Sequence, residues 1–202
     1  MPYLVFILGC VGLSIGSIGL HLSSFQQLDH ALLVWMSLER TPFLDVIAVF
    51  LSLFGGLPAV LLVSTLCCIW QIRSKNFSNI YFIVVGVLGS AVIGWVLKYA
   101  IHRPRPDFIQ PMIETYGASF PSAHSIYAAT LSALIVFIFH KHSRVRVIIF
   151  LACLWWIAMG ISRIYLGAHY LTDVLAGWGI GFMWIAMLRL VFSQFIFKNK
   201  FI

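Results

Sequence analysis

Long apolar runs separated by short polar segments make up most of this chain. The runs that predict membrane-spanning helices are residues 3–20, 43–70, 78–101, 123–140, 147–162 and 173–197. A hydrocarbon core about 30 Å thick requires about 20 apolar residues in a spanning helix. The pattern therefore predicts an all-α integral membrane protein, with six transmembrane helices in one bundle that forms a single domain over residues 1–202.

The segment 21–42, between the first two runs, has a different pattern. It contains charged and histidine side chains, so we do not expect it to span the membrane. Its apolar side chains recur at helical spacing: Phe25, Leu28, Leu32, Trp35 and Met36. A helix with one apolar and one polar face is typical of a helix that lies in the membrane interface. We therefore expect an interfacial amphipathic helix here, ended by Pro42.

Glycine and proline predict how the spans bend and pack. The second run is interrupted by Gly55, Gly56 and Pro58, so we expect a kink within it. Small residues allow helices in a membrane to approach closely. Such residues recur in the first run at Gly9, Gly12, Gly16 and Gly19, and in the last run at Gly177 and Gly181. These two runs are therefore expected to pack tightly against their neighbours.

Composition and charge support a membrane protein and exclude a soluble domain. The chain is 61% hydrophobic and only 9% charged, far from the usual composition of a soluble domain. Its net charge of +7 could suggest a nucleic-acid partner, but no polar domain carries a basic face, so none is expected. The bilayer is the expected partner, and the sequence carries no indication of the oligomeric state.

The charged residues sort between the two sides of the predicted bundle. The connections 71–77 and 141–146 and the C-terminus hold only basic residues: Arg73, Lys75, Lys141, Arg144, Arg146, Lys198 and Lys200. The six acids lie in or beside the other connections: Asp29, Glu39, Asp45, Asp107, Glu114 and Asp173. The positive-inside rule then predicts a protein of the cell (inner) membrane with both termini in the cytoplasm. The other connections, with the candidate active site, would face the periplasm or the exterior.

The first polar stretch on the predicted outer side, Lys98 to Pro106, crowds cations together. Lys98 lies near the end of the third run, Arg105 lies in the polar segment after it, and Arg163 directly follows the fifth run. A lysine point charge and two planar guanidinium groups suit the oxygens of a phosphate. Each could instead contact lipid headgroups. His102 and Arg103 are candidates for additional headgroup contacts, with plain interfacial polar residues as the alternative.

The second stretch, residues 121–124, opens the fourth predicted helix. Ser122 is placed as its N-cap, and the N–H groups near Ala123 lie at the positive end of the helix dipole. A helix N-terminus of this kind binds anions. His124 in the first turn is either an interfacial residue or a proton donor beside a bound phosphate.

The third stretch pairs His169 with Asp173, which are four residues apart at the predicted start of the last helix. Side chains at this spacing can meet. A carboxylate on one ring nitrogen fixes the histidine tautomer and leaves the other nitrogen free to attack. Alternatively, the two side chains could only hydrogen-bond to each other at the membrane interface, without a catalytic role. Metal binding is the weaker interpretation, because the three surrounding cations would repel a dication.

Together these stretches resemble the three-part signature of the type 2 phosphatidic acid phosphatases. Lys98 is followed after six residues by Arg105-Pro106, then come Pro-Ser-Ala-His at 121–124 and Ser162-Arg163, five residues, His169, three residues and Asp173. The order and spacings match throughout. Ala123 stands where the family usually has glycine, which adds a methyl group near the phosphate.

The resemblance implies a role for each of these residues. His169 would attack phosphorus and form a phosphohistidine, Asp173 would orient it, and His124 would protonate the departing lipid oxygen. Lys98, Arg105, Ser122, Arg163 and the N–H groups near Ala123 would hold the phosphoryl oxygens. No metal and no cofactor would be required, because fixed cations take that role.

The sequence therefore predicts a metal-independent lipid phosphatase at the outer leaflet. Expected substrates are phosphatidylglycerol phosphate, phosphatidic acid and undecaprenyl diphosphate, with Arg103 and His102 favouring a doubly phosphorylated or diphosphate headgroup. A lipid phosphotransferase with the same intermediate is an alternative. An anion transporter would more naturally carry charges at mid-membrane, and a silent scaffold would not need both histidines and Asp173.

Overall fold

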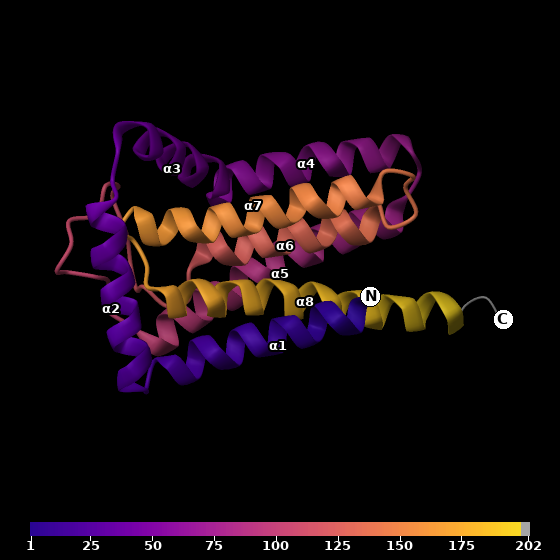
Figure 1. Ribbon diagram of the computed structural model, residues 1–202. Coiled ribbons are helices and arrows are strands. Elements are labelled where there is room, and N and C mark those ends of the chain that lie inside the picture. Colours follow the sequence, from indigo (N-terminus) through magenta and orange to yellow (C-terminus); the bar gives the residue numbers. More distant parts are fainter. Residues whose placement is uncertain (199–202) are drawn as a thin grey trace.

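The computed structural model describes residues 1–198, and the side chains of residues 1–192. Within this range the chain forms eight α-helices and no strand: α1 (Pro2–Gly19), α2 (Ser23–Leu38), α3 (Pro42–Gly55), α4 (Leu57–Arg73), α5 (Phe77–Ile101), α6 (Ala123–Ile138), α7 (Val145–Tyr165) and α8 (Leu171–Lys198). Figure 1 shows α4 to α8 and α1 running along one bundle, with α2 across its end. The predicted all-α fold is confirmed.

The described helices support four or five membrane spans by length and composition. α1, α5, α7 and most of α8 are long and apolar enough to cross a bilayer, and α3 with α4 makes a fifth candidate if the bent pair counts as one span. α6 is apolar but has only 16 residues, because the chain turns after Ile138, two residues earlier than expected. The count of six spans therefore stays a prediction.

The predicted kink in the second run is present. α3 and α4 meet at Gly56 with a bend of 57°. Gly56 is extended there (φ −71°, ψ 160°), and Pro58 lies in the first turn of α4, where a missing N–H costs no helical hydrogen bond. The bend turns α3 toward α7 and α6, and thereby brings Ser52 to the end of the bundle that carries the polar motifs.

Glycines allow α8 to lie in close contact with both α1 and α6. A Cβ atom at Gly16 of α1 would lie 2.6 Å from the carbonyl oxygen of Thr172. One at Gly177 of α8 would lie 2.7 Å from the carbonyl oxygen of Ser122. The close packing expected for these glycines is therefore present, and it brings the start of α8 against the start of α6, where the Ser122 N–H donates to the Asp173 carbonyl oxygen (3.1 Å).

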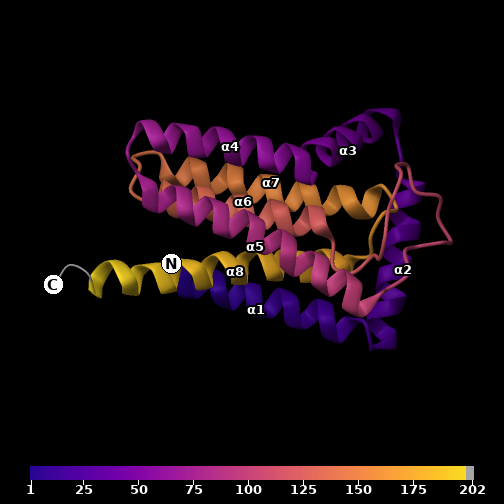
Figure 2. The same cartoon turned by 180° about the vertical axis from the view of Figure 1, so that it is seen from behind.

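The two ends of the bundle differ in charge. The turns after α4 and after α6 carry the basic residues and lie at the end away from α2 (Figures 1 and 2). The loop 102–122 and the starts of α6 and α8 lie at the end that α2 crosses. The predicted sorting of the connections thus corresponds to two physical ends. Lys198 and Lys200, which belong to the basic set, lie outside the described side chains.

Helix α2 packs one face on the bundle and exposes another. Asp29 and Leu33 are buried, whereas Leu28 and Trp35 are about half exposed. The helix expected between the first two runs is therefore present, and it ends before Pro42 as predicted. Its place in a membrane interface stays a prediction. Its buried acid, Asp29, faces the candidate site.

Candidate active site

The three polar stretches converge at the end of the bundle crossed by α2. Lys98 lies in the last turn of α5, Ser122 precedes α6, Arg163 lies near the end of α7, and Asp173 lies in the first turn of α8. Because these four helix ends are adjacent, residues far apart in the sequence share one site. The structure therefore brings together side chains from all three parts of the signature.

The spacing between Arg163 and His169 is explained by the turn that ends α7. Gly167 adopts a left-handed conformation (φ 71°) that suits glycine. The N–H of Gly167 donates to the Ile164 carbonyl oxygen (2.9 Å), and the N–H of Ala168 donates to that of Arg163 (3.1 Å). This is the Schellman arrangement. It reverses the chain, so that His169 returns beside Arg163 and lies just before α8.

His169 lies between a carboxylate and a guanidinium. Its Nδ1 is 3.4 Å from Oδ2 of Asp173, and its Nε2 is 3.4 Å from Nη1 of Arg105. A carboxylate only accepts and a guanidinium only donates. The arrangement therefore favours hydrogen on Nδ1 and a lone pair on Nε2. Nε2 is then the nitrogen that can attack.

The protonation state of His169 suits a nucleophile. The side chain is 2% exposed, and this burial lowers its pKa to about 3, assisted by Arg163 and Arg105 and opposed by Asp173. Because the pKa lies below the ordinary histidine value, the ring stays neutral throughout the physiological range. A neutral ring keeps the lone pair that attack on phosphorus requires.

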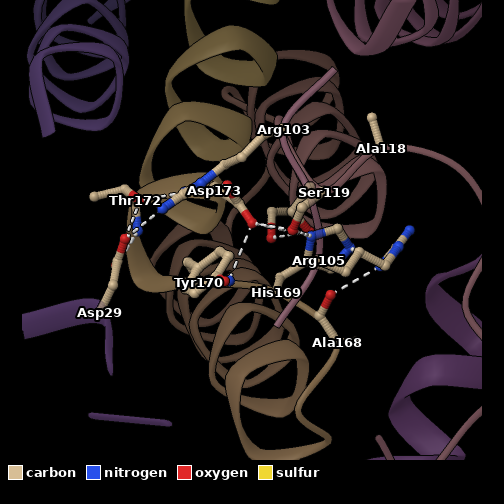
Figure 3. A network of polar contacts seen from close by, with 12 residues as sticks. Asp29, Arg103, Arg105, Ala118, Ser119, Ala168, His169, Tyr170, Thr172 and Asp173 are labelled. Atoms are coloured by element: carbon tan, nitrogen blue, oxygen red, sulfur yellow. Dashed lines mark hydrogen bonds and ion pairs between the residues drawn. The ribbon is translucent and has the colours of Figure 1, made fainter. Parts of the chain in front are cut away.

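Asp173 is buried and accepts from several donors. Its Oδ1 accepts from Nη1 of Arg103 (2.5 Å), while its Oδ2 accepts from the Ser119 hydroxyl (2.5 Å) and the Tyr170 N–H (3.0 Å). Figure 3 shows these groups meeting around the carboxylate. Such a set of donors keeps a buried carboxylate ionised and fixes its position. Asp173 is therefore held in a single orientation beside His169.

Two of the predicted phosphate-binding cations are held by backbone carbonyl groups. Lys98 Nζ donates to the carbonyl oxygen of Ala118 (2.6 Å). Arg105 donates to the carbonyl oxygens of Gly117 (3.0 Å), Tyr116 (2.7 Å) and Ala168 (2.8 Å). These bonds tie the loop 102–122 to the turn before α8. They use only part of the donors of each group, so donors remain for an anion next to Nε2 of His169.

Arg163 and His124 are joined through Ser52 of α3. Arg163 Nη1 donates to the Ser52 hydroxyl (2.5 Å), and His124 Nε2 donates to the Ser52 carbonyl oxygen (3.1 Å). A carbonyl oxygen accepts only, so Nε2 of His124 carries a hydrogen. Nε of Arg163 is buried without a hydrogen-bond partner among the described residues. An unpaired buried donor is costly, and an anion oxygen would satisfy it.

The start of α6 matches the predicted N-terminus with one difference. Ser122 is the N-cap residue, but its hydroxyl makes no capping bond and instead accepts from the Ser125 hydroxyl (3.0 Å). The N–H groups of the first helical turn, beginning at Ala123, have no partners within a helix. Ser122 and Ala123 therefore lie at a helix N-terminus, and their contact with a phosphate stays a prediction.

The two candidates for additional headgroup contacts, Arg103 and His102, are bonded to other groups of the protein. Arg103 uses Nη1 for Thr172 (2.7 Å) and Asp173, and Nη2 for Asp29 (2.9 Å). His102 ends α5 in a left-handed conformation, with its ring on the Tyr99 carbonyl oxygen. The geometry of Arg103 favours support of Asp173 over contact with a headgroup. Their headgroup role stays a prediction, without a contact here that supports it.

Sequence reasoning missed four polar residues of this network. Ser52, Ser119 and Thr172 are single hydroxyls in or beside apolar runs. Asp29 was used only to argue that its segment does not span and to sort the charges between the two sides. The position of Asp29 within its helical segment could have indicated a buried polar contact. It lies four residues after Phe25 and four before Leu33, on the face of α2 that packs inward. An acid on such a face requires a buried partner.

Comparisons with known proteins match the part of the chain that carries the signature. The PAP2 superfamily model matches residues 79–197, a range that includes all three parts of the signature but not Asp29 or Ser52. The chain is 29% identical over 174 residues to phosphatidylglycerophosphatase B of Bacillus subtilis (strain 168), covering 81% of this chain and 83% of the relative. It is 29% identical over 150 residues to the undecaprenyl-diphosphatase of Sulfolobus acidocaldarius, covering 72% and 68%.

A solved structure has the same fold. The crystal structure of a transmembrane PAP2-type phosphatidylglycerolphosphate phosphatase from Bacillus subtilis matches with a TM-score of 0.82 and 26% identity, over 96% of each chain. The match includes α1 to α3, which precede the region covered by the family model.

Proposed function

This chain belongs to the PAP2 superfamily of membrane lipid phosphatases, and from this premise we propose that it removes phosphate from a membrane lipid through a phosphohistidine at His169. The observation that carries the proposal is the ring of His169, with Nδ1 on Asp173 and Nε2 facing Arg105. This arrangement presents a neutral nucleophile to a position where cations would hold an anion.

The first step is an in-line displacement at phosphorus. The lone pair on Nε2 of His169 forms the bond to phosphorus as the bond to the lipid oxygen breaks. Protonated His124, whose Nε2 hydrogen is held by the Ser52 carbonyl oxygen, transfers its Nδ1 hydrogen to that leaving oxygen. Asp173 stabilises the positive charge that develops on the His169 ring. In the second step water attacks phosphorus, His124 accepts the water proton, and inorganic phosphate leaves His169.

Three cations balance the phosphoryl charge in both steps. Arg105 lies 3.4 Å from the attacking nitrogen, Lys98 and Arg163 lie at the same end of the bundle, and the start of α6 adds backbone N–H groups. Fixed cations of this kind supply the charge stabilisation that magnesium gives in many phosphoryl transfers. The reaction is therefore proposed to proceed without a metal ion.

The substrate is proposed to be a lipid phosphate, with phosphatidylglycerol phosphate the first to be tested. The Bacillus subtilis relative and the solved structure bear that substrate in their names. The sequence favours a diphosphate because of Arg103 and His102, and that argument weakens because both Nη atoms of Arg103 are bonded to protein. Phosphatidic acid and undecaprenyl diphosphate complete the panel, the latter because a second relative is an undecaprenyl-diphosphatase.

The active site is proposed to face the outside of the cell (inner) membrane. The support is the charge difference between the two ends of the bundle: the turns after α4 and α6 are basic and lack acids, whereas the site end carries the acids. By the positive-inside rule the basic end, with both termini, is cytoplasmic. The lipid headgroup then enters the site from the outer leaflet.

We expect the purified protein in detergent micelles to release inorganic phosphate from phosphatidylglycerol phosphate in the presence of EDTA. The fixed cations, rather than a metal, hold the phosphoryl oxygens, so the rate with EDTA should equal the rate without it. The measurement is a phosphate-release assay over the three-lipid panel, with the His169→Ala protein as control for contaminating phosphatases. Loss of activity on chelation and recovery with Mg²⁺ would reject the metal-free mechanism. Transfer of phosphate to an added alcohol in place of water would favour the phosphotransferase alternative.

A further inference from the structure

Asp29 of α2 is the outermost carboxylate of the active-site network, and it lies outside the matched family region. It is 1% exposed. Its Oδ1 accepts from the Thr172 N–H (3.0 Å), and its Oδ2 accepts from the Thr172 hydroxyl (2.6 Å) and from Nη2 of Arg103 (2.9 Å). Figure 3 shows Asp29 at the side of Arg103 that faces away from Ser119 and Arg105. Its hydrogen bonds therefore connect it to His169 through Arg103, Thr172 and Asp173 rather than directly.

Arg103 is shared between two carboxylates. Its Nη2 binds Asp29, while its Nη1 binds Asp173 (2.5 Å), and its guanidinium lies over the Tyr170 ring (4.0 Å). Burial lowers the pKa of Arg103, but Asp173 and Asp29 raise it more, so the net shift is upward and the group stays charged. These three side chains therefore carry one positive and two negative charges, a net charge of −1, beside the cations Lys98 and Arg105, which also interact with Asp173.

The net negative charge of these three side chains affects the positive charge that develops on His169. When Nε2 attacks phosphorus, the His169 ring gains positive charge, and Asp173 is the carboxylate that faces it. If Arg103 neutralised Asp173 alone, the ring would face a charge-neutral pair in a buried site. Because Arg103 is shared with Asp29, it neutralises less of the negative charge of Asp173. That negative charge therefore still acts on the ring. Electrostatic effects of this kind are large in a site of low dielectric constant.

We infer that Asp29 is a positioning residue for the reaction: by sharing Arg103, it keeps Asp173 negative toward the His169 nucleophile. The inference rests on the proposed function. Asp29 also binds the first turn of α8, where a carboxylate interacts favourably with the helix dipole. This second contact would stabilise the fold, so the test must separate the effect of charge from the effect of capping.

The charge effect predicts an unusual relation between a single and a double variant. Asp29→Asn leaves Arg103 against Asp173 alone, so kcat should fall about tenfold, the effect of one pKa unit of lost charge stabilisation, with KM changed less than about twofold because Asp29 does not touch the substrate. Adding Arg103→Gln returns the cluster to a single negative charge. The double variant should therefore turn over faster than Asp29→Asn alone.

A matched control and a conservative variant complete the set. Asp45→Asn makes the same chemical change at the same end of the bundle, where the carboxylate accepts from the Tyr165 hydroxyl (2.7 Å) instead of Arg103, and its kcat should stay near that of the wild type. Asp29→Glu keeps the charge, and a cavity of about 480 Å³ beside Asp29 and Arg103 has room for one methylene. It should keep kcat within about threefold, and it serves as the test if Asp29→Asn does not give folded protein.

The outcomes separate the inference from the proposed function. Wild-type kcat in Asp29→Asn, with His169→Ala inactive, overturns the inference alone. A double variant no faster than Asp29→Asn, or an Asp29→Glu protein as slow as Asp29→Asn, assigns the effect to lost bonds and also overturns the inference. Activity in His169→Ala rejects the proposed function, and the inference falls with it. Kinetics are measured on protein that elutes as one peak in detergent and melts cooperatively.

Discussion

Replacement of His169 by alanine is expected to abolish phosphate release while the protein still folds. The proposed reaction forms its intermediate on Nε2 of this ring, which faces Arg105 at 3.4 Å, and water placed in the resulting gap is a far weaker nucleophile. Loss of the nucleophile in a covalent mechanism lowers kcat by about 10⁵-fold or more. The measurement is phosphate release from phosphatidylglycerol phosphate by purified protein.

The matched control for this variant is His142→Ala. His142 is exposed at the opposite end of the bundle, where its ring accepts from the Arg144 N–H (3.1 Å). This variant should retain wild-type kcat and KM. A His169→Ala protein with more than a few per cent of wild-type activity would remove His169 from the role of nucleophile.

Asp173→Asn is expected to give the second largest effect, a fall in kcat of about 10³- to 10⁴-fold, comparable to loss of the orienting carboxylate in other histidine-dependent enzymes. The carboxylate accepts from Arg103, Ser119 and Tyr170 at its two oxygens. An asparagine amide has only one accepting oxygen, because its nitrogen donates. An amide N–H directed at Nδ1 of His169 would move the ring hydrogen to Nε2 and block attack. Slow turnover should remain, because the nucleophile and the cations are still present.

The control for the Asp173 variant is Asp107→Asn, in the exposed part of the loop 102–122. It should have no effect on kcat. The kinetic measurement should use single turnovers, because the expected defect lies in phosphorylation of His169 rather than in release of phosphate. A wild-type phosphorylation rate in Asp173→Asn would contradict the orienting role.

The fold could be predicted from the sequence as far as apolar runs determine it. The helix over 78–101 was expected nearly to the residue, and the structure has Phe77–Ile101. The run 43–70 was expected to kink at Gly55-Gly56, and it does so at 57°. The number of spans did not follow as directly, because hydropathy does not decide whether α3 and α4 form one span or whether the 16 residues of α6 cross a bilayer.

The candidate site could be predicted where charged residues stand out against an apolar chain. Lys98, Arg105, Arg163 and His169 stood out for this reason, and the structure brings them to one end of the bundle. Ser52 could not be found in this way. Its hydroxyl and its carbonyl group become important only because the kink after Gly55 turns α3 toward Arg163 and His124.

Arg103 shows the limit of reasoning from sequence about direction. Arg103 and Arg105 are separated by Pro104, and both were candidates for the phosphate or the headgroup. In the extended segment their side chains lie on different sides: Arg105 reaches Ala168 and His169, whereas Arg103 reaches Thr172 and Asp29. Alternate residues of an extended chain share a face only when the backbone is regular, and Pro104 and the tertiary bonds make it irregular here.

The central claim is that the phosphoryl group passes through His169, and trapping that intermediate tests it most directly. The reaction is run with ³²P-labelled p-nitrophenyl phosphate, whose leaving group needs no proton, on a His124→Ala protein in which hydrolysis of the intermediate is slowed. It is quenched in alkaline SDS, where phosphohistidine is stable, and the labelled peptide is identified. We predict acid-labile label on the peptide that contains His169, and none when His169→Ala is added. Release of nitrophenol without labelled protein, or label on another residue, would contradict the account.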